Sequence, residues 1–316
     1  MLSRTADHLF WMSRYMERAE NTARMVDVTC QTDLLPQSDA AAELGWRGLV
    51  AISELTGDYQ SRYGDIQADR VIRFMVADGH NLSSIYSCFR AARENARAVR
   101  GALTTEVWET MNQTWLEFNR LLREGEMDRD ASALLEWVKL RSHLSRGVAV
   151  GTMLEDEALR FTRMGSFLER ADNTARLLDV KFRAGESDVY GAADERDGAY
   201  DFYHWSAILR SVSGFEIYRK VYRNVIQPDK VAELLILRPD MPRSLAACVH
   251  QVVGNLSMVA NEQSAETLRR AGRLQADLQF GRIDEILATG LHVYLTQFLE
   301  RINEIGSGIS EDFLVA

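Results

Sequence analysis

The chain has 316 residues, 46% of them hydrophobic and 26% charged, a composition typical of globular proteins and long enough for two ordinary domains or one large one. Its formal net charge of −9 argues against a general nucleic-acid binder, which needs a dense basic face. No apolar run approaches the roughly 20 residues that cross a bilayer, so we expect no membrane segment. Three widely spaced cysteines favour a reduced cytoplasm over a disulfide framework.

The first predicted element is a long helix over residues 5–32, and a second follows over residues 155–183. Apolar residues recur at alternating steps of three and four, which is the periodicity of one helix face. In the first helix they are Leu9, Met12, Met16, Ala19, Ala23, Val26 and Cys30. Adding 152 to each number gives Phe161, Met164, Leu168, Ala171, Ala175, Leu178 and Phe182, again all apolar. Helices of about thirty residues are typical of a bundle.

A polar phrase inside these helices occurs twice, as ERAENTAR at 17–24 and ERADNTAR at 169–176. Over residues 17–28 and 169–180, nine of twelve positions are identical. Two weaker parallels follow at an offset of 160: VIRFMV at 71–76 resembles VAELLI at 231–236, and SSIYSCF at 83–89 resembles RSLAACV at 243–249. We therefore predict an all-α, long-helix bundle built from two duplicated halves, about 1–150 and 151–316. The halves should pack as one domain over 1–316 with pseudo-two-fold symmetry.

The expected breaks between elements lie at 35–38, around 125–130 and across 184–198. The last of these, AGESDVYGAADERDG, is rich in glycine and acidic residues, which is typical of a solvated loop. We predict almost no strand, because short β-branched runs sit within longer helical patterns.

The polar residues of the repeated phrase occupy a different face from the apolar residues. A helix turns about 100° per residue, so polar positions can be placed around Ala19 as the centre of the apolar stripe. The far face holds Glu17, Asn21 and Arg24 with Arg14 beside them, and Arg18 and Glu20 flank the stripe. The second copy places Glu169, Asn173 and Arg176 on the far face, flanked by Arg170 and Asp172.

Two interpretations of this polar face are open. It could be a Glu–Arg network that fixes the register of packed helices, or it could face a ligand or partner. We favour a functional cleft, because two buried copies of the phrase would make a costly polar centre for stability alone.

A second polar cluster occurs at 92–100, within ARENARAVR. Its candidate binding residues are Arg93, Glu94, Asn95 and Arg97. Arg93, Arg97 and Arg100 share one helix face, an arrangement suited to a carboxylate or phosphate group. A solvated basic stripe that pairs with neighbouring acids is the alternative, and it is slightly favoured.

Catalytic motifs are absent from the sequence. It contains no glycine-rich phosphate loop, no G-x-S-x-G and no H-E-x-x-H. Six histidines provide no Glu-x-x-His pair of the kind that a di-iron bundle needs. We therefore predict no metal site and no cofactor, and we identify no catalytic residue.

Several phrases together resemble the alpha-E family, bacterial all-helical proteins. They are MLSRTADHLFWMSRYMERAENTAR, FMVADGHNLSSI, ARENARAVRGALTTEVWETMN, FLERADNTARLLDV and RPDMPRSL. The resemblance implies a circularly permuted ATP-grasp protein as partner, often with a transglutaminase-like protein nearby, and hence a peptide-forming or peptide-modifying system. The chain departs from a strict repeat where Ser166 occupies the position equivalent to Arg14, so we expect the two halves to bind different groups.

Three functions are consistent with these features. The first is a helical partner module that binds an ATP-grasp ligase or its peptide substrate without doing chemistry itself. The second is an enzyme acting on amide or peptide bonds, with Glu17 or Glu169 as acid or base. The third is a purely structural dimerisation bundle, which is one form of homo-oligomer. The missing nucleophile and phosphate-loop motifs favour the first.

Overall fold

The computed structural model describes residues 1–35, 39–186 and 198–314, and every regular element in these ranges is a helix. The all-α prediction is therefore confirmed. Residues 3–152 form α1 (Ser3–Asp33), α2 (Asp39–Ile52), α3 (Thr56–Tyr63), α4 (Ala68–Val76), α5 (Ile85–Ala98), the 3-10 turn η1 (Arg100–Ala102), α6 (Thr105–Arg123), α7 (Glu126–Arg129) and α8 (Ala131–Thr152). Residues 157–313 form α9 (Glu157–Glu186), α10 (Gly198–Ser211), α11 (Phe215–Tyr222), α12 (Pro228–Ile236), α13 (Leu245–Val259), α14 (Ala265–Phe280), α15 (Ile283–Thr289) and α16 (Leu291–Phe313).

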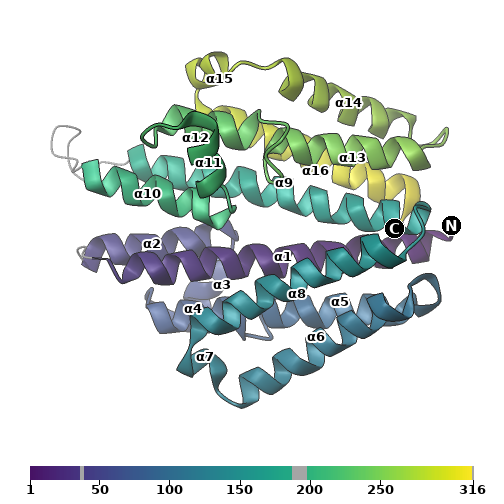
Figure 1. Cartoon of the computed structure of the whole chain (residues 1–316), viewed down its shortest axis with the longest axis horizontal. Helices are drawn as coiled ribbons and strands as arrows, with labels where there is room; N and C mark the ends of the chain where they lie inside the picture. Colours follow the sequence, from purple (N-terminus) through teal and green to yellow (C-terminus); the bar gives the residue numbers. More distant parts are fainter. Residues whose placement is uncertain (36–38, 187–197, 315–316) are drawn as a thin grey trace.

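The two helices that contain the repeated phrase lie side by side at the centre of the molecule (Figure 1). They are α1, with 31 residues, and α9, with 30 residues, so the expected length of about thirty residues is observed. α5 and α8 pack against α1, while α13 and α16 pack against α9. A side chain in the middle of α1 is therefore enclosed by other helices on most sides.

The described residues of both apolar stripes are buried, except Cys30, which is partly buried. Leu9 and Ala19 on α1 and Met164 and Ala171 on α9 are inaccessible to solvent, and they belong to one hydrophobic cluster that includes residues from both halves of the chain. Neither helix could cover so long a stripe alone, which explains why they pack together. The last stripe position, Phe182, lies outside the described side chains.

The axes of α1 and α9 approach closely at Gly165. A Cβ atom at this position would lie 2.3 Å from the backbone oxygen of Phe10 and 2.3 Å from the Ser13 hydroxyl oxygen. Only a residue without a side chain fits at this distance, so Gly165 sets how near the two helices come.

A capped turn places one further residue against α1. The hydroxyl of Ser244 caps α13, accepting a hydrogen bond from the backbone N–H of Ala247 at 3.0 Å and donating one to the carbonyl of Arg238. The hydroxyl of Thr174 on α9 donates to the carbonyl of Arg243 at 3.0 Å. Arg243, which directly precedes the cap, is thus held beside the central helices.

The predicted breaks agree only partly with the structure. The break around 125–130 contains the short helix α7, which begins after Gly125 in the left-handed conformation with φ of 75°. α9 continues to Glu186, beyond the predicted end at 183. Residues 36–38 and 187–197, which hold most of the other two breaks, lie outside the described part. None of the described helices is both long and apolar enough to cross a membrane.

Candidate functional site

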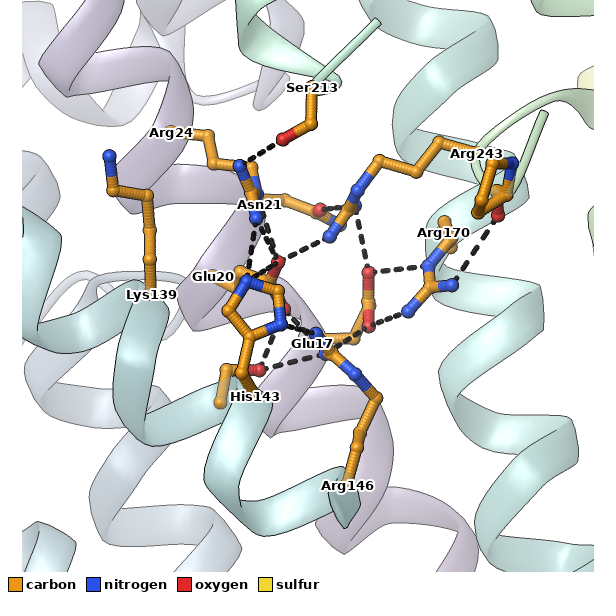
Figure 2. Close-up of polar contacts among 12 residues, drawn as sticks. Glu17, Glu20, Asn21, Arg24, Lys139, His143, Arg146, Arg170, Ser213 and Arg243 are labelled. Carbon is orange, nitrogen blue, oxygen red and sulfur yellow. Dashed lines mark hydrogen bonds and ion pairs between the residues drawn. The ribbon is translucent and has the colours of Figure 1, made fainter. Parts of the chain in front are cut away.

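The polar face of α1 is buried rather than solvated. Glu17 and Glu20, on adjacent turns, have carboxylates inaccessible to solvent. α8, α9 and the turn before α13 cover them (Figure 2). We use the term central cluster for Glu17, Glu20, Asn21, Arg24, Ser142, His143, Arg146, Arg170, Ser213 and Arg243.

Glu17 accepts hydrogen bonds from three arginines. Arg170 binds it through two parallel bonds, Nε to Oε1 at 2.9 Å and Nη2 to Oε2 at 2.8 Å. Nη1 of Arg243 donates to Oε1 and Nη1 of Arg146 donates to Oε2, both at 3.0 Å. Burial alone would raise the pKa of Glu17, but the charges of Arg170 and Arg243 hold it below its usual value. Its carboxylate is therefore ionised and fully occupied.

Glu20 is bound in the same way by a different set of donors. Nε of Arg24 donates to Oε1 at 2.9 Å and the Ser142 hydroxyl donates to Oε2 at 2.8 Å. Arg243 and Arg146 each make an additional contact with this carboxylate. Burial opposes ionisation here too, yet the surrounding guanidinium groups keep the pKa of Glu20 well below its usual value.

Arg24 connects the cluster to the other half of the chain and to the surface. Its Nη1 donates to the hydroxyl of Ser213 at 2.6 Å, and its Nη2 lies 3.1 Å from Nε2 of His143. Ser213 has a left-handed backbone with φ of 53°, which is uncommon for a residue with a side chain and turns its hydroxyl towards α1. The other His143 nitrogen, Nδ1, lies 2.8 Å from Nη2 of Arg146.

Glu169, the second-copy counterpart of Glu17, has its own arginine partners. Arg18 binds it through Nε at 2.6 Å and Nη2 at 3.1 Å, and Nε of Arg14 donates at 2.9 Å. Burial opposes ionisation, but these two cations lower the pKa of Glu169 to about 2. Each glutamate of the repeated phrase thus binds the arginine that follows the other glutamate: Glu17 binds Arg170, and Glu169 binds Arg18.

The last arginines of the two phrases, Arg24 and Arg176, make matching contacts. Each binds an acidic residue on its own helix and a residue of the other half. Arg176 binds Asp172 one turn earlier on α9, as Arg24 binds Glu20 on α1. Arg176 also contacts Glu54, a residue of the first half with φ of 57°. Burial raises the pKa of Asp172 despite the nearby Arg176. The remaining residue of the second phrase, Asn173, is partly buried on α9.

The replacement of the Arg14 equivalent by Ser166 has a structural counterpart. Ser166 lines a small cavity together with Glu17 and Arg146. Arg146, from α8, therefore supplies Glu17 with the additional cation that Arg14 supplies to Glu169. Whether the two halves bind different groups stays a prediction.

The candidates on α5 lie apart from the central cluster. Glu94 accepts from Nη1 of Arg93 at 2.6 Å and from Nε of Arg97 at 2.8 Å. The side chain of Asn95 contacts His8 at 2.7 Å. This geometry matches the alternative in which the basic stripe pairs with neighbouring acids.

Arg14 and Asp172 also line a surface pocket of about 400 Å³ between α1, α9 and α16. The Arg14 guanidinium lies 4.7 Å from the ring centroid of Trp11, within cation–π range. In the ranges that the structure describes, no three histidine, cysteine or acidic side chains are grouped so as to hold a metal ion.

Sequence reasoning missed five members of the central cluster, one of which is Ser213 in the turn between α10 and α11. Ser142, His143 and Arg146 belong to α8, where no repeat or motif marks them. Arg243 begins the weak repeat RSLAACV and lies within the phrase RPDMPRSL, directly before a capping serine, but these signals do not identify its partners.

One family model matches residues 1–314, and its family is described as a predicted alpha-helical domain with a conserved ER motif. The chain belongs to the alpha-E family. The Glu-Arg pairs of the repeated phrase, Glu17-Arg18 and Glu169-Arg170, fit that description, and in this alpha-E structure they bind each other across the α1–α9 contact.

Two curated relatives are uncharacterized proteins, one from Mycobacterium bovis and one from Mycobacterium tuberculosis. Each is 25% identical to this chain over an alignment of 334 residues that covers 95% of the chain and 35% of the relative. The chain therefore spans about a third of the length of the relatives it matches. No solved structure matches the chain.

Proposed function

We propose that this alpha-E chain is a non-catalytic helical module of a peptide synthesis or modification system. Its partner would be a circularly permuted ATP-grasp ligase, which it binds directly or through the ligase's peptide substrate, and a transglutaminase-like protein would be a second component. The supporting observation is that the alpha-E-like region of the mycobacterial relatives is only 35% of a longer chain. A region joined to further sequence in that way is expected to act beside other domains. We place the system in the cytoplasm, because three widely spaced cysteines favour a reducing compartment.

The chemistry of the central cluster supports binding over catalysis. A general base needs a free lone pair within reach of the substrate, and a general acid needs a proton to donate. Glu17 and Glu169 are buried, their pKa values are lowered and their oxygens accept from arginines. An enzyme that uses either residue as acid or base is therefore less well supported.

The cluster reaches the surface on α8. The side chains of His143 and Arg146 are 52% and 29% exposed, whereas the glutamates behind them are inaccessible. Leu140 and Leu144, one turn apart on the same helix, are exposed beside His143. Exposed apolar side chains bordered by polar ones are typical of protein interfaces, so we propose that the partner binds this face of α8.

The test is co-purification of the tagged chain with a circularly permuted ATP-grasp protein from the same organism. We expect the wild-type chain to retain the ligase and Leu140→Ser to lose most of it. Met258→Ser removes an apolar side chain from α13 that is even more exposed, at 68% against 57% for Leu140, and should behave as wild type. If no ligase is retained by the wild-type chain, or if both variants lose it equally, the proposal is wrong.

We also infer that the two halves are duplicated copies related by an approximate two-fold axis. The supporting observation is the reciprocal pairing of Glu17 with Arg170 and of Glu169 with Arg18. A purely structural homodimer is the alternative function. It would sediment as a dimer and retain no ligase.

A further inference from the structure

We propose that the central cluster binds a phosphate group between Arg24 and Arg146, at the place that the His143 ring occupies in this structure. The inference rests on the proposed function, because it names the chemical class of ligand for the same cluster. Three observations support it independently: the charge balance of the cluster, the hydrogen-bonding of His143 and a buried donor without an acceptor.

The central cluster has more positive charge than negative. Glu17 and Glu20 are bound by four guanidinium groups, those of Arg24, Arg146, Arg170 and Arg243. Within the described ranges this leaves a surplus of two positive charges in a mostly buried site. A surplus of this kind is costly in a medium of low polarity unless an anion compensates it.

Arg243 is a buried member of this set, and its pKa lies below the usual value. Burial lowers the pKa of its guanidinium, and the neighbouring cations Arg170 and Arg24 add to that effect. Glu17 and Glu20 act in the opposite direction without reversing it. Burial is therefore the main cause of the lowered pKa, and the neighbouring arginines contribute to it.

The hydrogen-bonding of His143 is contradictory without a further acceptor. Its Nδ1 faces Nη2 of Arg146 at 2.8 Å, and its Nε2 faces Nη2 of Arg24 at 3.1 Å (Figure 2). A guanidinium group only donates, and an imidazole ring has an N–H on at least one nitrogen. At least one of the two contacts therefore places one donor against another, whichever tautomer is present.

A buried donor in the same cluster also has no acceptor. The amide oxygen of Asn21 accepts from Nη1 of Arg243 at 2.9 Å, which fixes the orientation of the amide group. The amide nitrogen of Asn21 is buried and has no hydrogen-bond partner among the described residues. The cluster thus has an excess of donors as well as of positive charge, and an oxyanion is the ligand that supplies acceptors and negative charge together.

Phosphate suits the surplus better than a carboxylate does. A phosphate monoester has a charge of about −1.5 to −2 near neutral pH, which compensates both surplus cations, whereas a carboxylate compensates one. The oxygens of one phosphate are separated by a distance similar to that between the two imidazole nitrogens, so the group can accept from Arg24 and Arg146 in place of the ring. His143 is half exposed, so its ring can rotate outward from α8 and leave this place to the anion.

The experiment is calorimetric titration of the full chain, without the ligase, at constant ionic strength and neutral pH. The probes are inorganic phosphate, phosphoserine as a monoester, and acetate as a carboxylate. We expect one phosphate per chain, bound at least roughly ten-fold more tightly than acetate, as one more charge-assisted contact would give. Tighter binding of phosphoserine would assign the site to a phosphorylated ligand, and equal binding would assign it to the free ion. Both results support the proposal.

Variants locate the site. Arg146→Met should weaken phosphate binding by roughly ten- to one-hundred-fold, the range for one lost hydrogen bond to a charged group. Arg120→Met is the matched control, since it removes an exposed, paired arginine of α6 and should bind as wild type. His143→Ala should bind phosphate at least as tightly as wild type, because the ring no longer competes for the two arginines.

A measurement on the wild-type chain covers the case in which Arg146→Met does not fold. The imidazole nitrogen resonances of His143, assigned by comparison with His143→Gln, should shift on adding phosphate and not on adding acetate. The proposal is overturned if phosphate does not saturate, if the His143 resonances do not move, or if Arg146→Met and Arg120→Met bind equally. The ligase pull-down is scored separately, so a module that binds its partner but not phosphate would refute only this inference.

Discussion

The substitution Glu17→Gln tests whether the central cluster stabilises the fold. Glu17 is inaccessible to solvent and accepts four N–H bonds from three arginines. A glutamine has no charge to compensate these arginines, and its amide nitrogen would face a guanidinium donor. Breaking a buried ion pair costs on the order of 3–5 kcal/mol. For a chain of this size we expect the melting temperature to fall by roughly 6–10 °C.

Glu94→Gln provides the matched control for this experiment. It makes the same chemical change at a residue that binds two arginines, but the side chain of Glu94 is 42% exposed. An exposed pair contributes about 0–1 kcal/mol, so this variant should unfold almost as the wild type does. Urea and thermal unfolding followed by circular dichroism measure both. If Glu17→Gln is within about 1 kcal/mol of Glu94→Gln, the cluster does not stabilise the fold and our reasoning is refuted.

Three further outcomes are expected. Because the Glu169 pKa is lowered to about 2, the ionised carboxylate stabilises the fold fully above about pH 4.5, and this stabilisation is lost as the pH falls towards 2. Urea unfolding across that pH window should show that the free energy of unfolding of Glu169→Gln falls by about 3 kcal/mol less than that of wild type. Gly165→Ala should lower the free energy of unfolding in urea by about 1–3 kcal/mol, because its Cβ meets the α1 backbone. Gly254→Ala, in open space on α13, should be neutral or stabilising by up to about 1 kcal/mol. Equal effects of the two substitutions would contradict the close approach of α1 and α9. Burial raises the pKa of Cys88 and Cys248 to about 12, so at mildly alkaline pH both thiols should react with a disulfide reagent only after unfolding, and fast reaction of the native chain would disagree.

The central helices were predictable because their signal is local. An apolar residue every three or four positions identifies the buried face of α1 and of α9 without knowledge of their neighbours, and the described residues of both stripes are buried, except the partly buried Cys30. The repetition of the polar phrase also pointed to Glu17 and Glu169, because a polar face with fixed identities suggests specific contacts.

The partners of those glutamates could not be predicted in the same way. Arg146 and Arg243 lie 129 and 226 positions from Glu17, and one sequence contains no record of which distant residues meet. We expected the far face of α1 to border a cleft. A helical projection shows which side of a helix is polar, but it does not show what covers that side. In the fold, α8 and the turn before α13 cover that face, and among the described residues of the cluster His143, Arg146 and Ser213 extend to the surface.

The separation of these partners along the chain has a consequence for synthesis. Glu17 meets Arg146, Arg170 and Arg243 only when chain segments 129, 153 and 226 positions further on have been made. Contacts between such distant segments form late, because a long loop must close before the contact can stabilise the fold. Until Arg243 has left the ribosome, α1 has a charged face without its full set of counter-ions. Chains that terminate early are therefore expected to be removed by proteases as unfolded protein.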